Sequence, residues 1–145
     1  METTTTAQAT RVYLVEDSPL IRERLFDLLV EIDGVAIAGA ADSEAPAIAD
    51  LLRERPDIAI LDLHLAAGSG LNVLRTVHSR APEIKFIVLS GLSTPQYRYT
   101  CLNSGASHFF DKSSEMPQVR SLISKLAASH RVLPDREQKT ERVYS

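Results

Sequence analysis

Short apolar runs alternate with helical patterns along most of the chain. Runs such as RVYLV and VAIAG have the length of strands, and DIAILDL is apolar at consecutive positions, as expected of a strand covered on both faces. The strands predicted in this way are 11–15, 35–39, 57–63, 83–90 and 107–111. Between and after them apolar residues recur at helical spacing, and the last helix is predicted over 114–129. This alternation predicts an α/β domain with a doubly wound parallel sheet of five strands, five helices on its two faces and right-handed crossovers.

Capping and breaking residues separate the helices from the strands. Ser18-Pro19 and Thr94-Pro95 each combine an N-cap residue with a proline at the first helical position. Gly34 and Gly105 end two of the helical segments, and Pro56 closes another. These signals support the alternation of five strands with five helices.

The two ends of the chain lack this pattern. Residues 1–10 are rich in threonine without apolar periodicity, so we expect a disordered lead. Residues 131–145 form a charged, polar stretch that we expect to be a solvated tail. We therefore expect a single domain over 11–130, without an attached output domain.

Composition narrows the class of protein. The chain has 145 residues, and a domain of this size buries roughly 68–70% of its unfolded surface. One cysteine excludes an internal disulfide and fits a reducing compartment, here the cytoplasm. Neither an apolar run of about 18 residues nor a signal peptide is present, so no membrane insertion is expected. The net charge of −3 argues against a nucleic-acid-binding domain.

Polar residues follow the predicted strands where each strand ends. Glu16-Asp17 follows the first strand, Asp62 the third, Ser90 the fourth and Lys112 the fifth. The carboxyl ends of parallel strands share one edge of the sheet, so we expect these residues to lie together. Taken singly, each has an ordinary explanation as a turn, cap or surface residue. Together, three carboxylates repel one another, and such a cluster persists more easily around a cation.

The residue types at this edge fit phosphoryl chemistry on a magnesium ion. Carboxylate and water ligands suit Mg²⁺, which dehydrates reluctantly and uses few protein ligands. A lysine compensates the charge of a phosphoryl group, and a serine can donate a hydrogen bond to it. The carboxylate at the end of the central strand, Asp62, is then the natural nucleophile and would form an acyl phosphate.

Four segments resemble the receiver domains of response regulators, over about residues 11–130. They are VYLVEDSPLIRERL, IAILDLHLAAGSGLNVL, IVLSG and SGASHFFDKSSE. The resemblance implies a flavodoxin-like receiver fold with strand order 2-1-3-4-5, which the apolar pattern alone does not give. It also implies a stand-alone, single-domain regulator of a two-component system.

The resemblance assigns roles to the residues at the strand ends. Asp62 corresponds to the phospho-acceptor and Lys112 to the lysine that binds the phosphoryl group. Glu16 and Asp17 correspond to the acidic pair that binds Mg²⁺, with Asp17 as the direct ligand. The backbone carbonyl of His64 corresponds to a further metal ligand, and its side chain is expected near the entrance of the site.

The resemblance also implies a switch. Ser90 corresponds to the hydroxyl that moves toward the phosphoryl group, and Phe109 to an aromatic switch residue. Phosphorylation is expected to draw Ser90 inward and to let Phe109 rotate toward the interior, which alters the surface next to Tyr97 and Tyr99. The implied output face is built by the fourth helix, the fifth strand and the fifth helix, roughly residues 94–128.

Two positions depart from the family pattern. Members usually carry a proline four residues after the acceptor, where this chain has Ala66, and we expect a looser loop there. Many follow the lysine with a proline in a cis bond, where this chain has Ser113. A cis bond without proline costs about 2.5–4 kcal/mol, so the bond before Ser113 should be trans or strained.

As a member of this family the chain would regulate rather than catalyse. It would take its phosphoryl group from a histidine kinase or a histidine phosphotransfer protein and signal to a downstream protein, and homodimerisation is also open. The identity of these partners and the lifetime of the phosphorylated state do not follow from the sequence. A phosphorylation-independent adaptor on the same fold is the remaining alternative. An aspartate-based phosphatase would need an acid where His64 stands, and a flavin binder would need a different loop after the first strand.

Overall fold

The computed structural model describes residues 9–140, and of residues 130–140 only the course of the backbone. Residues 1–8 and 141–145, which include most of the expected lead and the end of the expected tail, lie outside the described residues. The strands are β1 (Thr10–Val15), β2 (Val35–Ala41), β3 (Ile58–Leu61), β4 (Lys85–Ser90) and β5 (Ala106–Asp111). The helices are α2 (Pro19–Val30), α3 (Glu44–Glu54), α4 (Gly70–Arg80), α5 (Pro95–Asn103) and α6 (Met116–Thr140).

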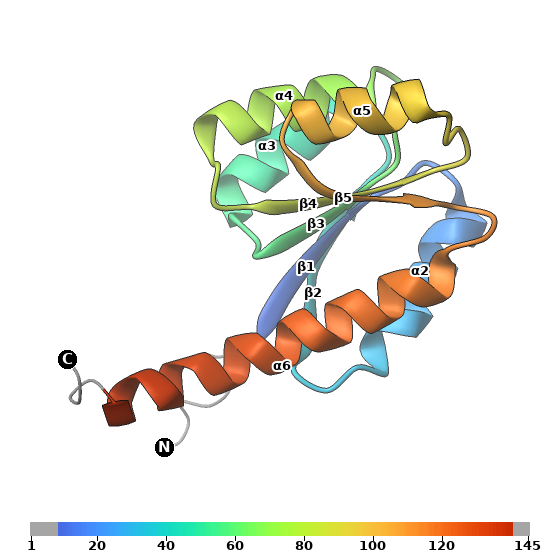
Figure 1. Cartoon of the computed structure of the whole chain (residues 1–145). Coiled ribbons are helices and arrows are strands. Elements are labelled where there is room, and N and C mark those ends of the chain that lie inside the picture. Colours follow the sequence, from blue (N-terminus) through green and yellow to red (C-terminus); the bar gives the residue numbers. More distant parts are fainter. Residues whose placement is uncertain (1–8, 141–145) are drawn as a thin grey trace.

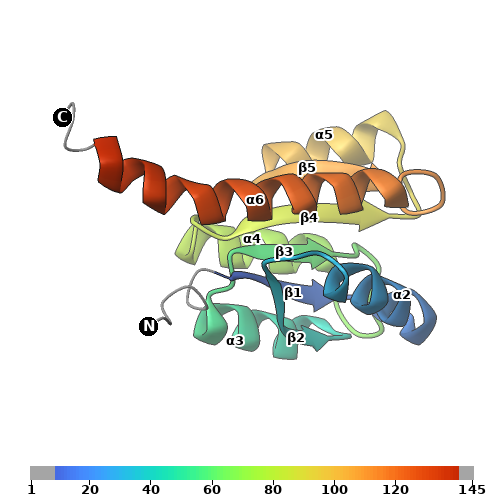
Figure 2. The same ribbon diagram turned by 90° about the horizontal axis from the view of Figure 1, so that it is seen from below.

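The strands form one parallel sheet in the order β2-β1-β3-β4-β5, which can be followed in Figure 2. The predicted class and the order implied by the resemblance are both confirmed. Because β1 and β4 flank β3, the turns after β1, β3 and β4 lie beside one another at a single edge. This edge carries the polar residues singled out from the sequence.

Helices cover both faces of the sheet, with α3, α4 and α5 on one side and α2 and α6 on the other (Figure 1). Alternation along β1 shows how the two faces are filled. Tyr13 and Val15 are buried in the core beneath α3, α4 and α5. Val12 and Leu14 are buried in the second core, beneath α2 and α6. Strand β1, which lies inside the sheet, is apolar on both faces and is therefore covered by a core on each side.

The predicted capping residues begin their helices. The Ser18 hydroxyl accepts a hydrogen bond from the Ile21 N–H at the start of α2. The Thr94 hydroxyl accepts one from the Tyr97 N–H at the start of α5. Each cap satisfies a donor that has no partner within its own helix.

The structure corrects several boundaries: β2 extends to Ala41 rather than ending at residue 39, and β4 begins at Lys85 rather than at residue 83. Thr10, assigned to the disordered lead, is the first residue of β1 and is 2% exposed, because its N–H donates to the Gly34 carbonyl at 2.7 Å. Strand β3 ends at Leu61 rather than at residue 63, which places Asp62 directly after it. Helix α6 continues to Thr140 instead of ending near residue 129, and it runs through Pro134, a residue that disfavours helix interiors.

The described peptide bonds are all trans, including the one between Lys112 and Ser113. Within the part of the chain that the structure describes, no helix combines the length and the apolar composition needed to cross a membrane.

Candidate functional site

Three carboxylates meet at the carboxyl edge of the sheet. One oxygen each from Glu16, Asp17 and Asp62 lies within 4.8 Å of the others. Glu16 and Asp62 are buried, at 2% and 4% exposed, while Asp17 is half-buried. The tertiary structure thus brings together residues that lie 46 positions apart in the chain, as the strand-end pattern predicts.

Asp62 is fixed by the backbone on both sides of it. Its N–H donates to the Val15 carbonyl at 2.9 Å, which continues the β1–β3 pairing by one residue. Its Oδ1 accepts a hydrogen bond from the His64 N–H at 3.3 Å. The first residue of α4, Gly70, approaches so closely that a Cβ there would lie 2.1 Å from the Asp62 carbonyl oxygen. Only glycine lets α4 begin this close to Asp62.

Lys112 reaches the cluster from the end of β5. Its Nζ lies 3.1 Å from Asp62 Oδ2 and 3.1 Å from Glu16 Oε1. Its own N–H donates to the Ser90 carbonyl at 2.8 Å, which anchors the lysine beside β4. Burial by itself would lower the pKa of Lys112, but the charges of Asp62 and Glu16 outweigh it and raise that pKa. The ammonium therefore stays charged.

The surroundings of Glu16 shift the pKa of its carboxyl group. Burial, and next the charge of Asp62, raise the pKa of Glu16 to about 7, although the Ser18 N–H and Lys112 act in the opposite direction. Its backbone carbonyl also accepts a hydrogen bond from Arg22 Nη1 at 2.8 Å. Among these side chains three carboxylates face one ammonium, so the site has an excess of negative charge. That excess and the all-oxygen donor set fit a hard divalent cation.

Ser90 lies at the expected place but its hydroxyl is bonded to the following loop. The side chain is fully buried at the end of β4. Its hydroxyl donates to the Leu92 carbonyl at 3.1 Å and accepts from the Leu92 N–H at 3.0 Å. A phosphoryl group on Asp62 could take this donor only by drawing it away from Leu92.

Phe109 does not lie where we expected a switch residue that rotates inward from the surface. Its side chain is only 6% exposed, within the core beneath α3, α4 and α5. The Arg98 guanidinium stacks over the ring, 4.9 Å from its centroid, and Arg98 Nη1 donates to the Phe109 carbonyl at 3.3 Å. Phe109 therefore cannot rotate inward from the surface in this structure, because its ring is already enclosed.

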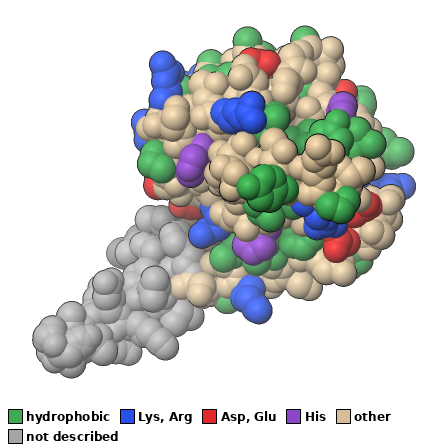
Figure 3. All heavy atoms as spheres, turned by 45° about the horizontal axis from the view of Figure 1, so that its top comes forward, with side chains coloured by type: hydrophobic (Ala, Val, Ile, Leu, Met, Phe, Trp, Pro, Cys, Tyr) green, Lys and Arg blue, Asp and Glu red, His purple; other side chains and the backbone are tan. Residues whose placement is uncertain are grey.

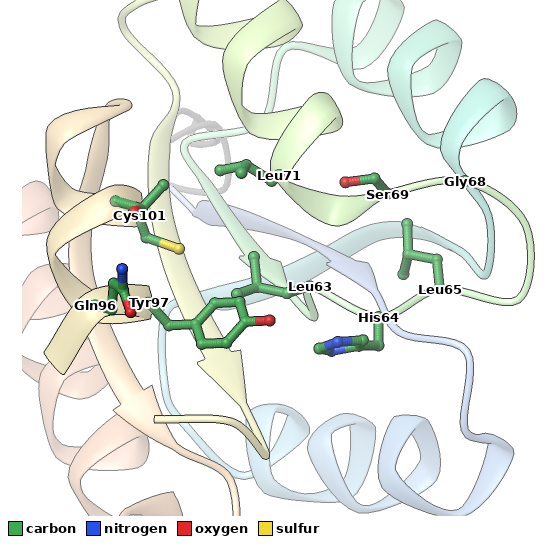
Figure 4. Close-up of a pocket in the computed structure, with 10 residues that line it drawn as sticks. Leu63, His64, Leu65, Gly68, Ser69, Leu71, Gln96, Tyr97 and Cys101 are labelled. Carbon is green, nitrogen blue, oxygen red and sulfur yellow. The ribbon is translucent and has the colours of Figure 1, made fainter. Parts of the chain in front are cut away.

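His64 stands at the mouth of a cavity beside the cluster. The His64 side chain is exposed, and its ring meets the Tyr97 ring edge-on with 6.4 Å between centroids. Figure 4 shows these two rings on opposite sides of the cavity, with Leu63 and Cys101 deeper inside it. The cavity has a volume of about 550 Å³ and lies between the loop after Asp62 and α5. Its wall is therefore continuous with the acceptor position.

Three residues of this region were not indicated by the sequence. Arg22 supports Glu16, Arg98 covers Phe109, and Glu44 bonds to the loop after Asp62. Glu44 and its partner Ser69 are 25 residues apart. No pattern along the chain reports such contacts, because each depends on which elements the fold places side by side.

Known proteins resemble the chain over this whole domain. The family model for the response regulator receiver domain matches residues 12–124. The DNA-binding transcriptional activator DevR/DosR of Mycobacterium tuberculosis is 29% identical over 87% of this chain and 58% of its own length. A protein-glutamate methylesterase/protein-glutamine glutaminase of Anaeromyxobacter dehalogenans is 32% identical over 92% of this chain and 42% of its own length.

A solved structure agrees with this match. The signal receiver domain of the putative response regulator NarL from Mycobacterium tuberculosis superposes with a TM-score of 0.75, at 28% identity, over 83% of this chain and 97% of that one. The chain spans about half the length of the curated relatives that it matches, and those relatives differ in the activity for which they are named. What is shared is the receiver domain.

Proposed function

The chain belongs to the response regulator receiver domain family, and we propose that it is a two-component signalling switch that accepts a phosphoryl group on Asp62. One observation carries the proposal: the Lys112 ammonium contacts Asp62 and Glu16 together, at 3.1 Å each, with the Asp17 carboxylate alongside. An ion pair formed only for stability would need one acid for one lysine. A surplus of buried acids beside the lysine is the arrangement that a cation and a phosphoryl group would complete.

In the proposed reaction the donor is a phosphohistidine of a histidine kinase or of a histidine phosphotransfer protein. A carboxylate oxygen of Asp62 attacks phosphorus, the new O–P bond forms as the N–P bond breaks, and the imidazole leaves with the electron pair and takes up a proton. Lys112 pairs with the Asp62 carboxylate before the attack and afterwards faces the phosphoryl oxygens. The Ser90 hydroxyl gives up the Leu92 carbonyl to donate to one of those oxygens.

Glu16, Asp17, Asp62 and the His64 backbone carbonyl are the groups that would hold Mg²⁺. Bound there, the ion neutralises charge on the phosphoryl group during transfer. The raised pKa of Glu16 is consistent with this fit: burial raises it first and the charge of Asp62 second, and Lys112 only partly offsets them. Asp17, the least buried of the three acids, is proposed as the direct ligand.

The proposed output surface is the face of α5, β5 and the first part of α6, roughly residues 94–128. Figure 3 shows hydrophobic side chains gathered on the side that carries α4 and α5, where Tyr97, Tyr99 and Leu102 are exposed large side chains of α5. Movement of the Ser90 hydroxyl would release the Leu92 backbone, which leads directly into α5. A downstream protein in the cytoplasm that prefers this arrangement would bind the phosphorylated form more tightly, by about 5–150-fold for an ordinary coupling.

One observation favours a second candidate, an adaptor that binds its partner without phosphorylation. Phe109 is already enclosed beneath Arg98, and large apolar side chains of α5 are exposed nearby. A partner could recognise this surface directly. Phosphoryl uptake decides between the two candidates.

The test is phosphorylation by acetyl phosphate with Mg²⁺, followed by intact mass measurement and treatment with hydroxylamine. We expect the wild type to gain one hydroxylamine-labile phosphoryl group, and Asp62→Asn to gain none. Asp57→Asn is the matched control, because Asp57 is exposed at the opposite end of β3 and should leave uptake unchanged. Asp17→Ala should need more Mg²⁺ for the same uptake. Labelling of a folded Asp62→Asn protein would contradict the assignment, and a wild type that takes up no phosphoryl group would favour the adaptor.

A further inference from the structure

The loop that follows the acceptor, residues 64–69, is bonded to the first residue of α3. The Glu44 N–H donates to the Ala67 carbonyl at 2.9 Å. In return, the Ser69 N–H donates to Glu44 Oε1 at 2.9 Å. The other carboxylate oxygen of Glu44, Oε2, accepts a hydrogen bond from the Asn72 side-chain amide. One glutamate thus holds the end of the loop and the first turn of α4.

The loop is shaped for this close contact. Gly68 has φ +93°, and a Cβ there would lie 2.3 Å from the Cβ of Glu44. The Ala66 N–H donates to the Asp42 carbonyl at 3.3 Å, a bond that a proline at this position could not make. The loop expected to be loose at Ala66 is therefore tied to the start of α3 by several contacts.

The opposite side of the loop leads directly to the acceptor. Ser69 pairs with His64 in an antiparallel bridge, and the Gly70 N–H donates to the Leu63 carbonyl at 2.9 Å. The His64 N–H in turn donates to Asp62 Oδ1 at 3.3 Å. Figure 4 shows the chain from Leu63 to Ser69 along one wall of the cavity. A continuous series of contacts therefore runs from Glu44 through Ser69 and His64 to the acceptor.

We propose that Glu44 is a positioning residue for the phosphoryl-accepting site, acting through Ser69 to fix the His64 backbone against Asp62. The proposal deepens the proposed function and rests on it, because the His64 carbonyl is one of the groups assigned to Mg²⁺. Glu44 touches none of the reacting groups. Its effect is to keep the carbonyl and N–H of His64 in one orientation before any ligand arrives, which lowers the cost of ordering the site.

The chemistry of Glu44 suits this role. The Ser69 N–H, and next the Asn72 amide, lower the pKa of Glu44, so it is ionised at neutral pH and makes charge-assisted hydrogen bonds. A glutamate that served only to begin α3 would need no partner 25 residues away. The positioning role and a purely structural role therefore differ in what Glu44→Ala should change.

The experiment compares Glu44→Ala with the wild type and with Glu54→Ala. Glu54 is the matched control: it is the last residue of α3, and it pairs with Arg11, away from the loop. Mg²⁺ affinity is measured by NMR titration of the backbone amides without any phosphoryl donor, alongside hydrogen exchange and urea unfolding. For Glu44→Ala we expect a Mg²⁺ Kd higher by about 3- to 10-fold, and faster exchange at the amides of residues 64–70. Glu54→Ala should lower stability without either change.

A rescue separates positioning from general damage. Glu44→Gln keeps an acceptor for the Ser69 N–H, and the Asn72 amide can turn its oxygen toward the new Nε2 donor, so both hydrogen bonds persist without the charge. We expect Glu44→Gln to keep the Mg²⁺ Kd within about twofold of the wild type, whereas Glu44→Ala raises it.

Two outcomes would overturn the proposal. One is a Mg²⁺ Kd and loop exchange in Glu44→Ala equal to those of the wild type. The other is a change in Glu54→Ala as large as that in Glu44→Ala. A wild type that binds Mg²⁺ but takes up no phosphoryl group would instead refute the proposed function, and the comparison of Kd values would still decide the role of Glu44.

Discussion

At the scale of single residues, the site is a balance between buried acids and one lysine. Glu16 is almost fully enclosed, accepts a hydrogen bond from the Ser18 N–H and shares Lys112 with Asp62. One ammonium cannot neutralise two buried carboxylates, so holding them together lowers the free energy of unfolding. Both of the following predictions test this balance in the chain as it stands, before phosphorylation.

The raised pKa of Glu16 predicts a specific pH dependence of stability. The pKa rises from 4.5 to about 7 on folding, so between these values the folded chain keeps a proton that the unfolded chain releases. The free energy of unfolding should therefore fall as pH rises through this interval. Urea unfolding with EDTA should show wild type losing stability relative to Glu16→Gln as pH rises from about 4.5 to about 7. Parallel curves for the two proteins would contradict the shift, and Mg²⁺ should shrink the difference.

Lys112→Ala should be strongly destabilising, because it leaves Glu16 and Asp62 without their shared counter-ion. Removing one partner of a mostly buried ion pair costs about 2–4 kcal/mol. Urea unfolding in EDTA measures the loss, and Lys85→Ala, at the exposed first position of β4, is the control. Added Mg²⁺ should recover part of the loss, since the cation restores positive charge beside the carboxylates. A loss no larger than that of Lys85→Ala would mean that Lys112 does not balance the cluster.

At the scale of elements, α5 buries little of its own surface. Cys101 is its one buried residue, while Tyr97 and Leu102 are exposed and Tyr99 is 68% exposed. Arg98 supplies the main polar attachment: it covers Phe109 and pairs with Glu115. A helix with so little buried surface is suited to shift when the loop before it changes.

Arg98→Ala should therefore loosen α5 before the rest of the fold. The cation–π contact and the bond to the Phe109 carbonyl together contribute about 1–2 kcal/mol. Hydrogen exchange should quicken in α5 and remain unchanged in α4, and Phe109 should become more exposed. Arg80→Ala, at the exposed end of α4, is the control and should change neither. Unchanged exchange in α5 would show that other contacts hold the helix.

At the scale of the whole molecule, Asp62 lies where the two cores meet the edge of the sheet. Leu61 and Leu63 beside Asp62 belong to the core under α3, α4 and α5, whereas Ile60 belongs to the core under α2 and α6. Both cores are closely packed. We expect a change at the site to reach the surface through the loop from Ser90 to Thr94 and through helix α5, which buries only Cys101.

Beryllofluoride, a mimic of the phosphoryl group, tests the route from site to surface. With Mg²⁺ it should change the amide chemical shifts of Asp62, of the loop from Ser90 to Leu92, and of α5 and β5. The route expected here is release of Leu92 by Ser90, not rotation of an outward Phe109. Asp62→Asn is the control and should show no change in α5. Shifts confined to the surroundings of Asp62 would contradict an output surface at 94–128.

The sequence by itself determined the element types and the members of the acidic site. Strands and helices follow from periodicity and caps, which are local properties. The placement of Glu16, Asp17 and Asp62 at one edge also follows, because parallel strands bring their carboxyl ends to the same edge of the sheet. Their contact further requires β1 to lie beside β3. The order of the strands came only with the resemblance, since alternation of elements is compatible with several orders.

Contacts between distant segments were decided by the tertiary structure alone. Lys112 and Glu16 are 96 residues apart, and their pairing fixes the charge balance of the site. Glu44 reaches Ser69, and Arg98 encloses Phe109, without any signal along the chain. Such contacts depend on helix positions over the sheet to within a few ångströms, which the packing of both cores sets together. A local pattern can name the groups that meet at an edge, but their distances, burial and protonation arise only when the whole chain is packed.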